Sequence, residues 1–360
     1  MYHQRRPSAT SSIDCNHHAR YVTVRVWILT EAHMADNLTP AEIRQRYGDL
    51  PYITPYERIV ALVDEASGLV ELHEYHARGV CSGGAAWEVY HYERTSPLVR
   101  AARREGSRNI FLCGQGRADL ELSPGIAGAG LEEVRVLDGE VRVTYAGLAG
   151  GGVAATLCRG MAEGVISTTV HEAGGGAALG RATLRLPVMR KLVIGVDDTD
   201  DAKRGATWST ANEIAFELQE DGSCLYLGHV ISQLFPENPF KTTNCCATAI
   251  ILGANPADTG DVTDRFASEL EKACFSDQCG MAVSSSVEIA DELRAFSISA
   301  ARRMVSLEHA GRVAARCSVE LRQVTGERGL IGALAAVGAH EDPDAAVIPF
   351  AGEPGSTGKS

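Results

Sequence analysis

One short stretch restricts the folds open to this chain more than any other. Residues 191–196 read Lys-Leu-Val-Ile-Gly-Val, and four carboxylates follow within the next five positions. A continuous apolar run of this length is typical of a central strand that is buried on both faces of its sheet. Side chains just beyond the carboxyl end of such a strand reach the crevice where α/β folds bind ligands. We therefore expect a mixed α/β fold with a candidate site that begins at Asp197.

The carboxylate cluster after this strand favours a bound cation. Carboxylates at such close spacing repel one another unless a cation or hydrogen-bond donors accompany them. Asp197 can turn back toward the sheet, while Asp198 and Asp200 can share a Mg²⁺ ion with a polyphosphate. The alternative is a solvated turn that caps the next helix. An Asp-x-Asp pair is also typical of haloacid-dehalogenase phosphatases, but the features described next fit another family better.

Two further segments carry residues suited to phosphate binding. The loop at 239–244 contains Lys241, which can neutralise a phosphate, and Thr242, which can donate to its oxygens. Gly329 and Gly332 open an apolar helix, where backbone N–H groups can approach an anion closely. Taken singly, a loop lysine is usually solvated and helix glycines usually serve close packing.

Together these segments resemble the ATP-using domain of the archaeal tRNA(Ile) agmatinylcytidine synthetases. The matching motifs are Gly-Val-Asp-Asp-Thr-Asp at 195–200, Pro-x-Lys-Thr at 239–242 and Arg-Gly-Leu-Ile-Gly-Ala-Leu-Ala-Ala at 328–336. From Leu38 onward the chain is similar to methanogenesis marker protein 11, a family of methane-producing archaea. That similarity rests on Tyr-Glu-Arg-Ile-Val at 56–60, Ala-Gly-Leu-Ala-Gly at 146–150 and Gly-Ala-Thr-Trp-Ser at 205–209.

The resemblance implies roles for the candidate residues. Asp197, Asp198 and Asp200 would serve Mg²⁺ and ATP, and we expect Asp198, Asp200 and Lys241 to be catalytic. The remaining contacts to the nucleotide are expected from Asp197, Thr199, Thr242, Gly329 and Gly332.

The chain also departs from the synthetase pattern at two places. The Lys-Thr-Arg-Gly-Asn of the family reads Lys-Thr-Thr-Asn-Cys from Lys241 onward, so an arginine is lost. Trp208 stands where a phosphate-handling threonine would fall, which leaves Thr207 or Ser209 as substitutes.

We therefore expect a Mg²⁺- and ATP-dependent phosphotransferase or ATPase of unknown acceptor, associated with methanogenesis. The alternative is a nucleotide-responsive assembly or activation factor for methyl-coenzyme M reductase that makes no product of its own. Cytidine modification on tRNA ranks last. The formal net charge is −12, most of it in the second half of the chain, and nucleic-acid binding depends on basic contacts to phosphate. We therefore expect a nucleotide and a protein of the methanogenesis machinery as partners, but not nucleic acid.

The fold class expected is α+β and α/β, in two mixed domains. Residues 38–188 form an N-terminal α+β domain, and residues 189–350 form the synthetase-like, ATP-binding α/β domain. Residues 1–37 and 351–360 are expected to be disordered.

Local patterns predict several elements of the N-terminal domain. A capping box at 39–42 starts a helix, and strands at 59–63 and 69–75 form a hairpin. Asp138 and Gly139 form a tight turn between strands at 134–136 and 141–143. Residues 87–92 alternate like a strand, and residues 96–106 read as a short basic helix. The glycine run at 145–152 resembles a phosphate-binding turn, but there we favour close packing.

The cysteines and the hydropathy point to a location. The ten cysteines are scattered without a CxxC pair, so zinc-ribbon and iron–sulfur spacings are absent. We expect reduced thiols and a cytoplasmic protein. No apolar run is long enough to span a bilayer, so no membrane association is expected.

Overall fold

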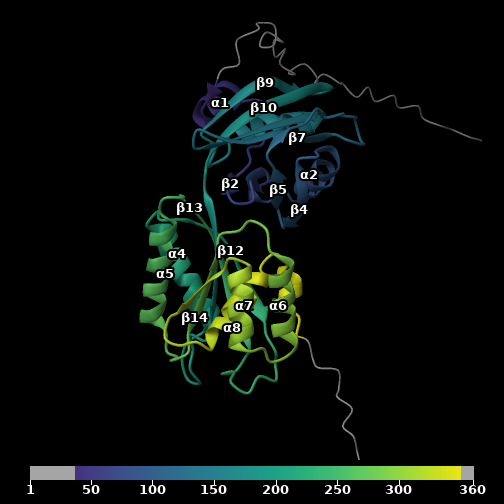
Figure 1. The fold of residues 1–360 in the computed structure, drawn as a ribbon. Coiled ribbons are helices and arrows are strands. Elements are labelled where there is room, and N and C mark those ends of the chain that lie inside the picture. Colours follow the sequence, from purple (N-terminus) through teal and green to yellow (C-terminus); the bar gives the residue numbers. More distant parts are fainter. Residues whose placement is uncertain (1–36, 350–360) are drawn as a thin grey trace, which may run out of the picture. The chain divides into compact units, whose positions relative to one another are not determined.

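The computed structural model describes residues 37–349 (Figure 1). They form three antiparallel sheets with helices, which confirms the expected mixed α+β fold. The disorder expected for 1–37 and 351–360 lies outside the described residues, apart from Asn37, which belongs to strand β1. The division into two domains stays a prediction.

The apolar run at 191–196 forms the middle strand of a five-stranded sheet. The strand order is β12-β13-β11-β14-β15, and every neighbouring pair is antiparallel. A central strand is therefore confirmed, although its neighbours do not run parallel to it. The strands are β11 (Arg190–Asp197), β12 (Leu225–Gln233), β13 (Cys246–Ala254), β14 (Gly280–Ser284) and β15 (Glu320–Gln323).

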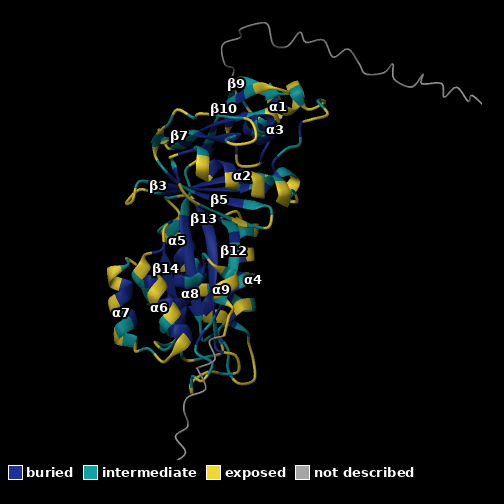
Figure 2. Cartoon of the chain, turned by 90° about the vertical axis from the view of Figure 1, so that its right-hand side faces the viewer, coloured by how far each residue is buried: buried dark blue, intermediate teal, exposed yellow. Residues whose placement is uncertain are grey.

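Helices cover both faces of this sheet, which explains why β11 is apolar at consecutive positions. Leu192, Ile194 and Val196 pack against α4 (Thr207–Glu220) and α5 (Thr259–Ala273). Val193 packs on the opposite face, against α6 (Asp291–Arg302), α7 (Leu307–Arg316) and α8 (Gly329–Ala339). The strands lie buried between the helices, whose outer faces are exposed (Figure 2). The short helix α9 (Pro343–Ala346) follows α8.

Close approach of α8 requires a glycine in β11. A Cβ at Gly195 would lie 2.8 Å from the carbonyl carbon of Ala333 in α8, closer than real Cβ contacts. The glycine thus sets the position of α8 beside the carboxyl end of β11, where the carboxylate cluster begins.

The segment before β11 is built from two antiparallel sheets that share one core. The four-stranded sheet contains β2 (Arg58–Asp64), β3 (Leu69–Tyr75), β5 (Arg108–Gly114) and β4 (Val99–Glu105). The six-stranded sheet contains β1 (Asn37–Leu38), β9 (Ser167–Gly175), β10 (Ala178–Pro187), β8 (Glu140–Leu148), β7 (Ala129–Leu137) and β6 (Gly116–Arg117). The helical pieces are α1 (Pro40–Tyr47), α2 (Ser82–Thr95) and α3 (Ala149–Val153), which continues into a π-helical turn at Ala154–Cys158.

Several local predictions for this segment are confirmed. Thr39 caps α1 through a reciprocal bond with Glu42. β2 and β3 form the predicted hairpin. Asp138 and Gly139, which connect β7 to β8, have positive φ angles, as a tight two-residue turn requires.

Two local predictions in the same segment are wrong. Residues 87–92 belong to helix α2, whose buried positions Ala85, Glu88 and Tyr92 recur at helical spacing. The basic stretch after Ser96 forms strand β4, at the edge of its sheet. Both stretches have ambiguous local patterns, so packing against β5 and β7 decides their structure.

The described part of the chain bears on the predictions about thiols and membrane spans. Every cysteine described there is a free thiol. In the stretch 37–349, no helix has the length and apolar character that crossing a membrane demands.

Candidate functional site

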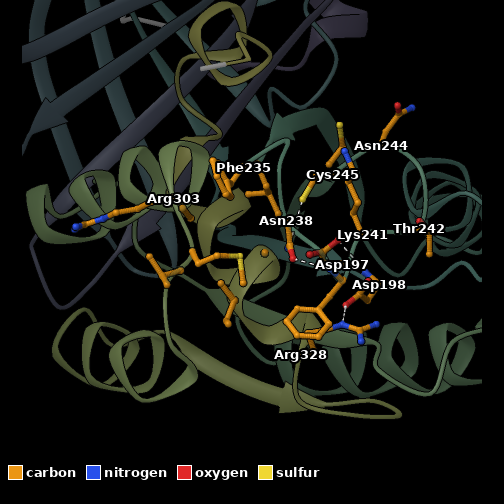
Figure 3. A pocket seen from close by; sticks show the side chains of 18 of the residues that line it. Asp197, Asp198, Phe235, Asn238, Lys241, Thr242, Asn244, Cys245, Arg303 and Arg328 are labelled. Carbon is orange, nitrogen blue, oxygen red and sulfur yellow. Dashed lines mark hydrogen bonds and ion pairs between the residues drawn. The ribbon is translucent and has the colours of Figure 1, made fainter. Parts of the chain in front are cut away.

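A cavity of about 230 Å³ brings together most of the residues singled out from the sequence (Figure 3). It lies beside the turn after β11, the loop between β12 and β13, and the first turns of α8. The predicted residues that line it are Asp197, Asp198, Asp200, Lys241, Thr242 and Gly332.

The turn after β11 has an unusual backbone. Asp198 has a φ angle of +58°, in the left-handed region that aspartate tolerates better than most residues. Its backbone N–H donates to Oδ1 of Asp197 at 2.9 Å. Residues in strained backbone conformations of this kind cluster at functional sites.

Asp198 has a cationic partner from a distant part of the chain. Nε of Arg328 donates to Oδ2 of Asp198 at 2.9 Å. Burial raises the pKa of Asp198, and the Arg328 guanidinium opposes that shift. Burial, followed by the charge of Asp198, raises the pKa of Asp197 well above its usual range. Burial thus disfavours the ionised form of both carboxyl groups, and most strongly that of Asp197.

Asp200 is held by hydroxyl groups. Oδ2 of Asp200 accepts from Thr242 at 2.8 Å, and Oδ1 accepts from Thr207 at 3.1 Å. Thr207 therefore reaches the acidic turn, as one of the two substitutes expected for the missing threonine, whereas Trp208 is 53% exposed. The hydroxyl of Thr242 fixes the loop between β12 and β13 to this turn.

Two predicted residues do not line the cavity. Thr199 is fully buried, and its hydroxyl bonds to that of Thr207 at 3.0 Å. Gly329 packs between backbones, since a Cβ there would lie 2.6 Å from the nitrogen of Gly280 and 2.7 Å from the carbonyl oxygen of Asp197. Thr199 thus fixes the acidic turn to Thr207, and Gly329 lets the start of α8 approach the backbone of that turn.

Lys241 lines the cavity, but its ammonium group has a different partner from the one expected. Nζ donates to the backbone carbonyl of Pro236, within the same loop. The side chain is thus directed along its own loop (Figure 3). To neutralise a phosphate it has to exchange this carbonyl for the phosphate oxygens.

Sequence reasoning missed several residues of the cavity. Arg328 stands directly before the glycine-opened helix, and that position was a usable signal for an anion- or carboxylate-binding residue. Arg303 comes from the end of α6, and no local pattern marked it. One part of the lining is apolar and contains Leu234, Phe235, Phe240, Met304, Val305 and Ile331.

The oxygen donors of the cavity suit Mg²⁺ only in part. Among residues 37–349, no group of three or more His, Cys, Asp or Glu side chains forms a ready-made metal site. Asp200 accepts hydrogen bonds from two threonine hydroxyls, and Asp198 pairs with Arg328. The carboxyl groups with raised pKa values are Asp197 and Asp198. Mg²⁺ usually binds through one or two carboxylates together with phosphate oxygens and water. The residues therefore suit an ion that arrives with a phosphate, and not a preformed cage.

Comparison with known proteins gives the C-terminal part a family resemblance. Residues 193–326 match the family model described as the TiaS TCKD domain. Among solved structures, the complex of TiaS with an isoleucine tRNA and ATP is 25% identical, with a TM-score of 0.38. A tRNA fluorescent labeling enzyme is 26% identical, with a TM-score of 0.37. Each match covers 41% of this chain and 36% of the other, so the chain spans about a third of the length of these solved proteins.

The expectation that nucleic acid is not a partner is wrong. The matching domain model comes from TiaS, whose solved structures include complexes with its tRNA. The expectation relied on net charge, which is a property of the whole chain. A binding surface depends on local charge, which the net charge of the chain does not give.

A further relative matches nearly its whole length. The uncharacterized protein MJ0921 of Methanocaldococcus jannaschii is 40% identical over 286 residues, which cover 79% of this chain and 94% of that protein. This extent of identity shows that the chain belongs to the same family as the uncharacterized protein MJ0921.

Proposed function

We propose that the cavity after β11 binds ATP together with Mg²⁺ and that the protein is an ATP-dependent phosphotransferase or ATPase. The observation that carries the proposal is the pairing of charges in one cavity. Burial disfavours the ionised forms of Asp197 and Asp198, which line one cavity with Arg328 and Lys241, and a bound cation stabilises those ionised forms. Positioning and charge neutralisation supply most of what phosphoryl transfer needs from a protein.

The residues divide into roles under this proposal. Asp197 and Asp198 provide the carboxylate ligands for Mg²⁺, which neutralises charge on the phosphates. Arg328 and Lys241 contact phosphate oxygens, and Asp200 holds Thr242 in place. The apolar side of the cavity, at Phe235 and Met304, faces the less polar part of the nucleotide.

The size of the cavity adds a requirement. Its volume of about 230 Å³ is below the ~300–1,000 Å³ typical of small-molecule sites. A bound nucleotide therefore extends beyond the cavity, unless the loop at 238–244 moves outward to enlarge it. The same movement releases Lys241 from the carbonyl of Pro236.

Titration calorimetry with ATP, with and without Mg²⁺, tests the proposal. We expect binding that weakens at least tenfold in excess chelator. Asp198→Asn should also weaken the binding, and Asp201→Asn is its matched control. Asp201 pairs with Arg204 at the surface and does not line the cavity. Equal affinity with and without Mg²⁺ contradicts the metal role, and absence of ATP binding contradicts the proposal as a whole.

A second candidate function is ATP-dependent modification of tRNA. It is supported by the match of residues 193–326 to the TiaS TCKD domain. Incubation with labelled ATP and total archaeal tRNA distinguishes the candidates. Label or mass added to tRNA favours modification, whereas release of phosphate without any change in tRNA favours the ATPase.

The association with methanogenesis and the assembly-factor alternative also remain proposals. They rest on the resemblance to methanogenesis marker protein 11. The assembly factor differs from the enzyme in having no modified product, so the same assay, repeated with methyl-coenzyme M reductase present, separates them. We also propose that residues 189–350 form the nucleotide-binding domain, which expression of this segment alone tests.

A further inference from the structure

Strand β12 forms one edge of the five-stranded sheet, and its free side lacks the charges that usually keep an edge unpaired. The strand pairs with β13 only. It reads Leu-Tyr-Leu-Gly-His-Val-Ile-Ser-Gln, without proline, lysine, arginine or a carboxylate. Burial lowers the pKa of His229, so this side chain is uncharged at neutral pH. Natural proteins usually protect a free edge with charged residues, prolines or a very short strand.

The other edges of the described sheets have such protection. β4 carries three arginines and a glutamate, and β1, β6 and β15 are no longer than four residues. On the outer side of β2, Arg58 and Leu62 form bridges with Glu163 and Met189. Along residues 37–349, β12 is therefore the only long edge strand without a charged side chain.

The register shows which backbone groups of β12 remain free. The N–H of Leu234 donates to the carbonyl oxygen of Cys245 at 2.7 Å, so these two residues form a hydrogen-bonded pair. Such pairs alternate with pairs whose N–H and C=O groups point away from the neighbouring strand. The backbone groups of His229, Ile231 and Gln233 therefore point to the free side, where no group of the described residues bonds to them.

The amino-terminal part of β12 is already covered. The ladder with β13 is irregular there, and Nη1 of Arg108 donates to the carbonyl oxygen of Leu227. The free stretch is therefore 229–233, and Ile231 lies at its centre. Ile231 is partly buried, but it belongs to none of the hydrophobic clusters of the core.

Helix α4 places exposed aromatic side chains beside this edge. The hydroxyl of Tyr226 donates to Asn212, and the ring centroid of Trp208 lies 6.3 Å from that of His229. Trp208, Asn212 and Phe216 are spaced by four residues, so they share the face of α4 that contacts β12. Trp208 is 53% exposed and Phe216 is 47% exposed. Apolar surface beside an unpaired strand is typical of a protein–protein interface.

We propose that β12 pairs with β12 of a second copy of this chain, in antiparallel orientation about a two-fold axis at Ile231. His229 then forms a hydrogen-bonded pair with Gln233 of the partner subunit, and Ile231 with Ile231 of the partner subunit. The free positions are symmetric about Ile231, so every free N–H of one copy meets a free C=O of the other. The two five-stranded sheets become one continuous sheet.

Two arguments favour a second copy over a flexible peptide as the occupant. A folded copy offers a strand that is already ordered, whereas a flexible peptide loses conformational entropy when it docks. Two-fold dimers are also the commonest assemblies of identical chains. None of the three pairing residues lines the proposed nucleotide cavity, so the dimer does not depend on the proposed function.

Sedimentation equilibrium of the full chain at micromolar concentration tests the proposal, and we expect twice the mass of one chain. Ile231→Glu places two carboxylates directly opposite each other at the two-fold axis, and Ile231→Lys places two ammonium groups there. Like charges in directly opposite positions are destabilising, so each variant alone should dimerise at least about tenfold more weakly. An equal mixture of the two variants should recover the dimer, because opposite charges then face each other.

Ala101→Glu is the matched control, since Ala101 is exposed on the edge strand β4 and lies outside the proposed interface. This variant should dimerise like the parent. Ile231→Pro provides a second test, because an edge strand tolerates proline where the lost N–H faces away from its own sheet. It should be monomeric and keep a cooperative thermal transition. The proposal is overturned if the parent is monomeric, if Ile231→Glu dimerises as tightly as the parent, or if the mixture of folded variants stays monomeric.

Discussion

Nε of Arg328 donates to Oδ2 of Asp198 over 2.9 Å, although 130 positions separate the two residues in the chain. The bond joins the start of α8 to the turn after β11. Asp198 thus has a fixed cation nearby, while Asp197 accepts a backbone N–H, and burial raises the pKa of Asp197 well above its usual range. This asymmetry underlies the first prediction.

Asp198→Asn should abolish nucleotide turnover and leave the fold intact. Loss of the carboxylate removes one Mg²⁺ ligand, and we expect turnover to fall by at least ~100-fold. The repulsion with Asp197 is relieved and the ion pair with Arg328 is lost at the same time, so the free energy of unfolding should change by less than about 1 kcal/mol. A phosphate-release assay and thermal unfolding measure the two effects. Full turnover in this variant would show that Asp198 is not a Mg²⁺ ligand and only forms part of the turn.

Gly332→Ala should disturb the acidic site from the side of α8. A Cβ there would collide with the carboxyl group of Asp197 and lie 2.8 Å from Cδ1 of Leu234. We expect a destabilisation of about 1–3 kcal/mol and weaker ATP binding, because Asp197 has to move. Gly311→Ala in α7 is the control. Its Cβ meets no atom within 4 Å, so it should stabilise the helix by about 0.5–1 kcal/mol. Urea denaturation measures the free energy of unfolding of both variants. Equal values would contradict the close contact between Gly332 and Asp197.

Arg159→Met should be strongly destabilising. The guanidinium is fully buried and bonds to Glu74 at 2.6 Å and Glu88 at 3.0 Å. Removing it leaves buried carboxylates without a cation, which costs about 3–5 kcal/mol. Arg312→Met, which breaks an exposed pair with Glu308, should change the free energy of unfolding by less than about 0.5 kcal/mol. Similar losses in the two variants would disprove the importance of the buried network.

His340 should make the protein less stable in acid. Burial, and then the charge of Lys191, lowers its pKa from 6.5 to about 3. Between these values the unfolded chain binds more protons than the folded one, so stability falls as pH drops from 6.5 toward 3. At about pH 4 this difference in pKa lowers the free energy of unfolding by about 3 kcal/mol relative to neutral pH.

The variant His340→Gln isolates this contribution from that of the carboxylates. It should lose less stability than the parent between neutral pH and about pH 4, as measured by urea denaturation at each pH. Parallel pH profiles for the two proteins would show that His340 is not a buried neutral group.

Much of the C-terminal fold is readable from local pattern. The run at 191–196 predicts a buried central strand, and the apolar positions Val262, Phe266 and Leu270 predict helix α5. These signals are strong because each of these residues lies on the face of its helix or strand that packs into the core. The shared location of Asp197, Lys241 and Gly332 also follows from the resemblance to one domain.

By itself, the sequence determined where the acidic turn stands, which helix begins with glycine and how the hairpin of β2 and β3 pairs. Only the tertiary structure decided that α2 is a helix, that Arg328 reaches Asp198, that Lys241 bonds to its own loop and that β12 forms an edge of its sheet. The physical reason is range. Turn, cap and periodicity signals act within a few residues, whereas hydrogen-bond partners, burial and pKa depend on groups that the fold brings together from distant positions.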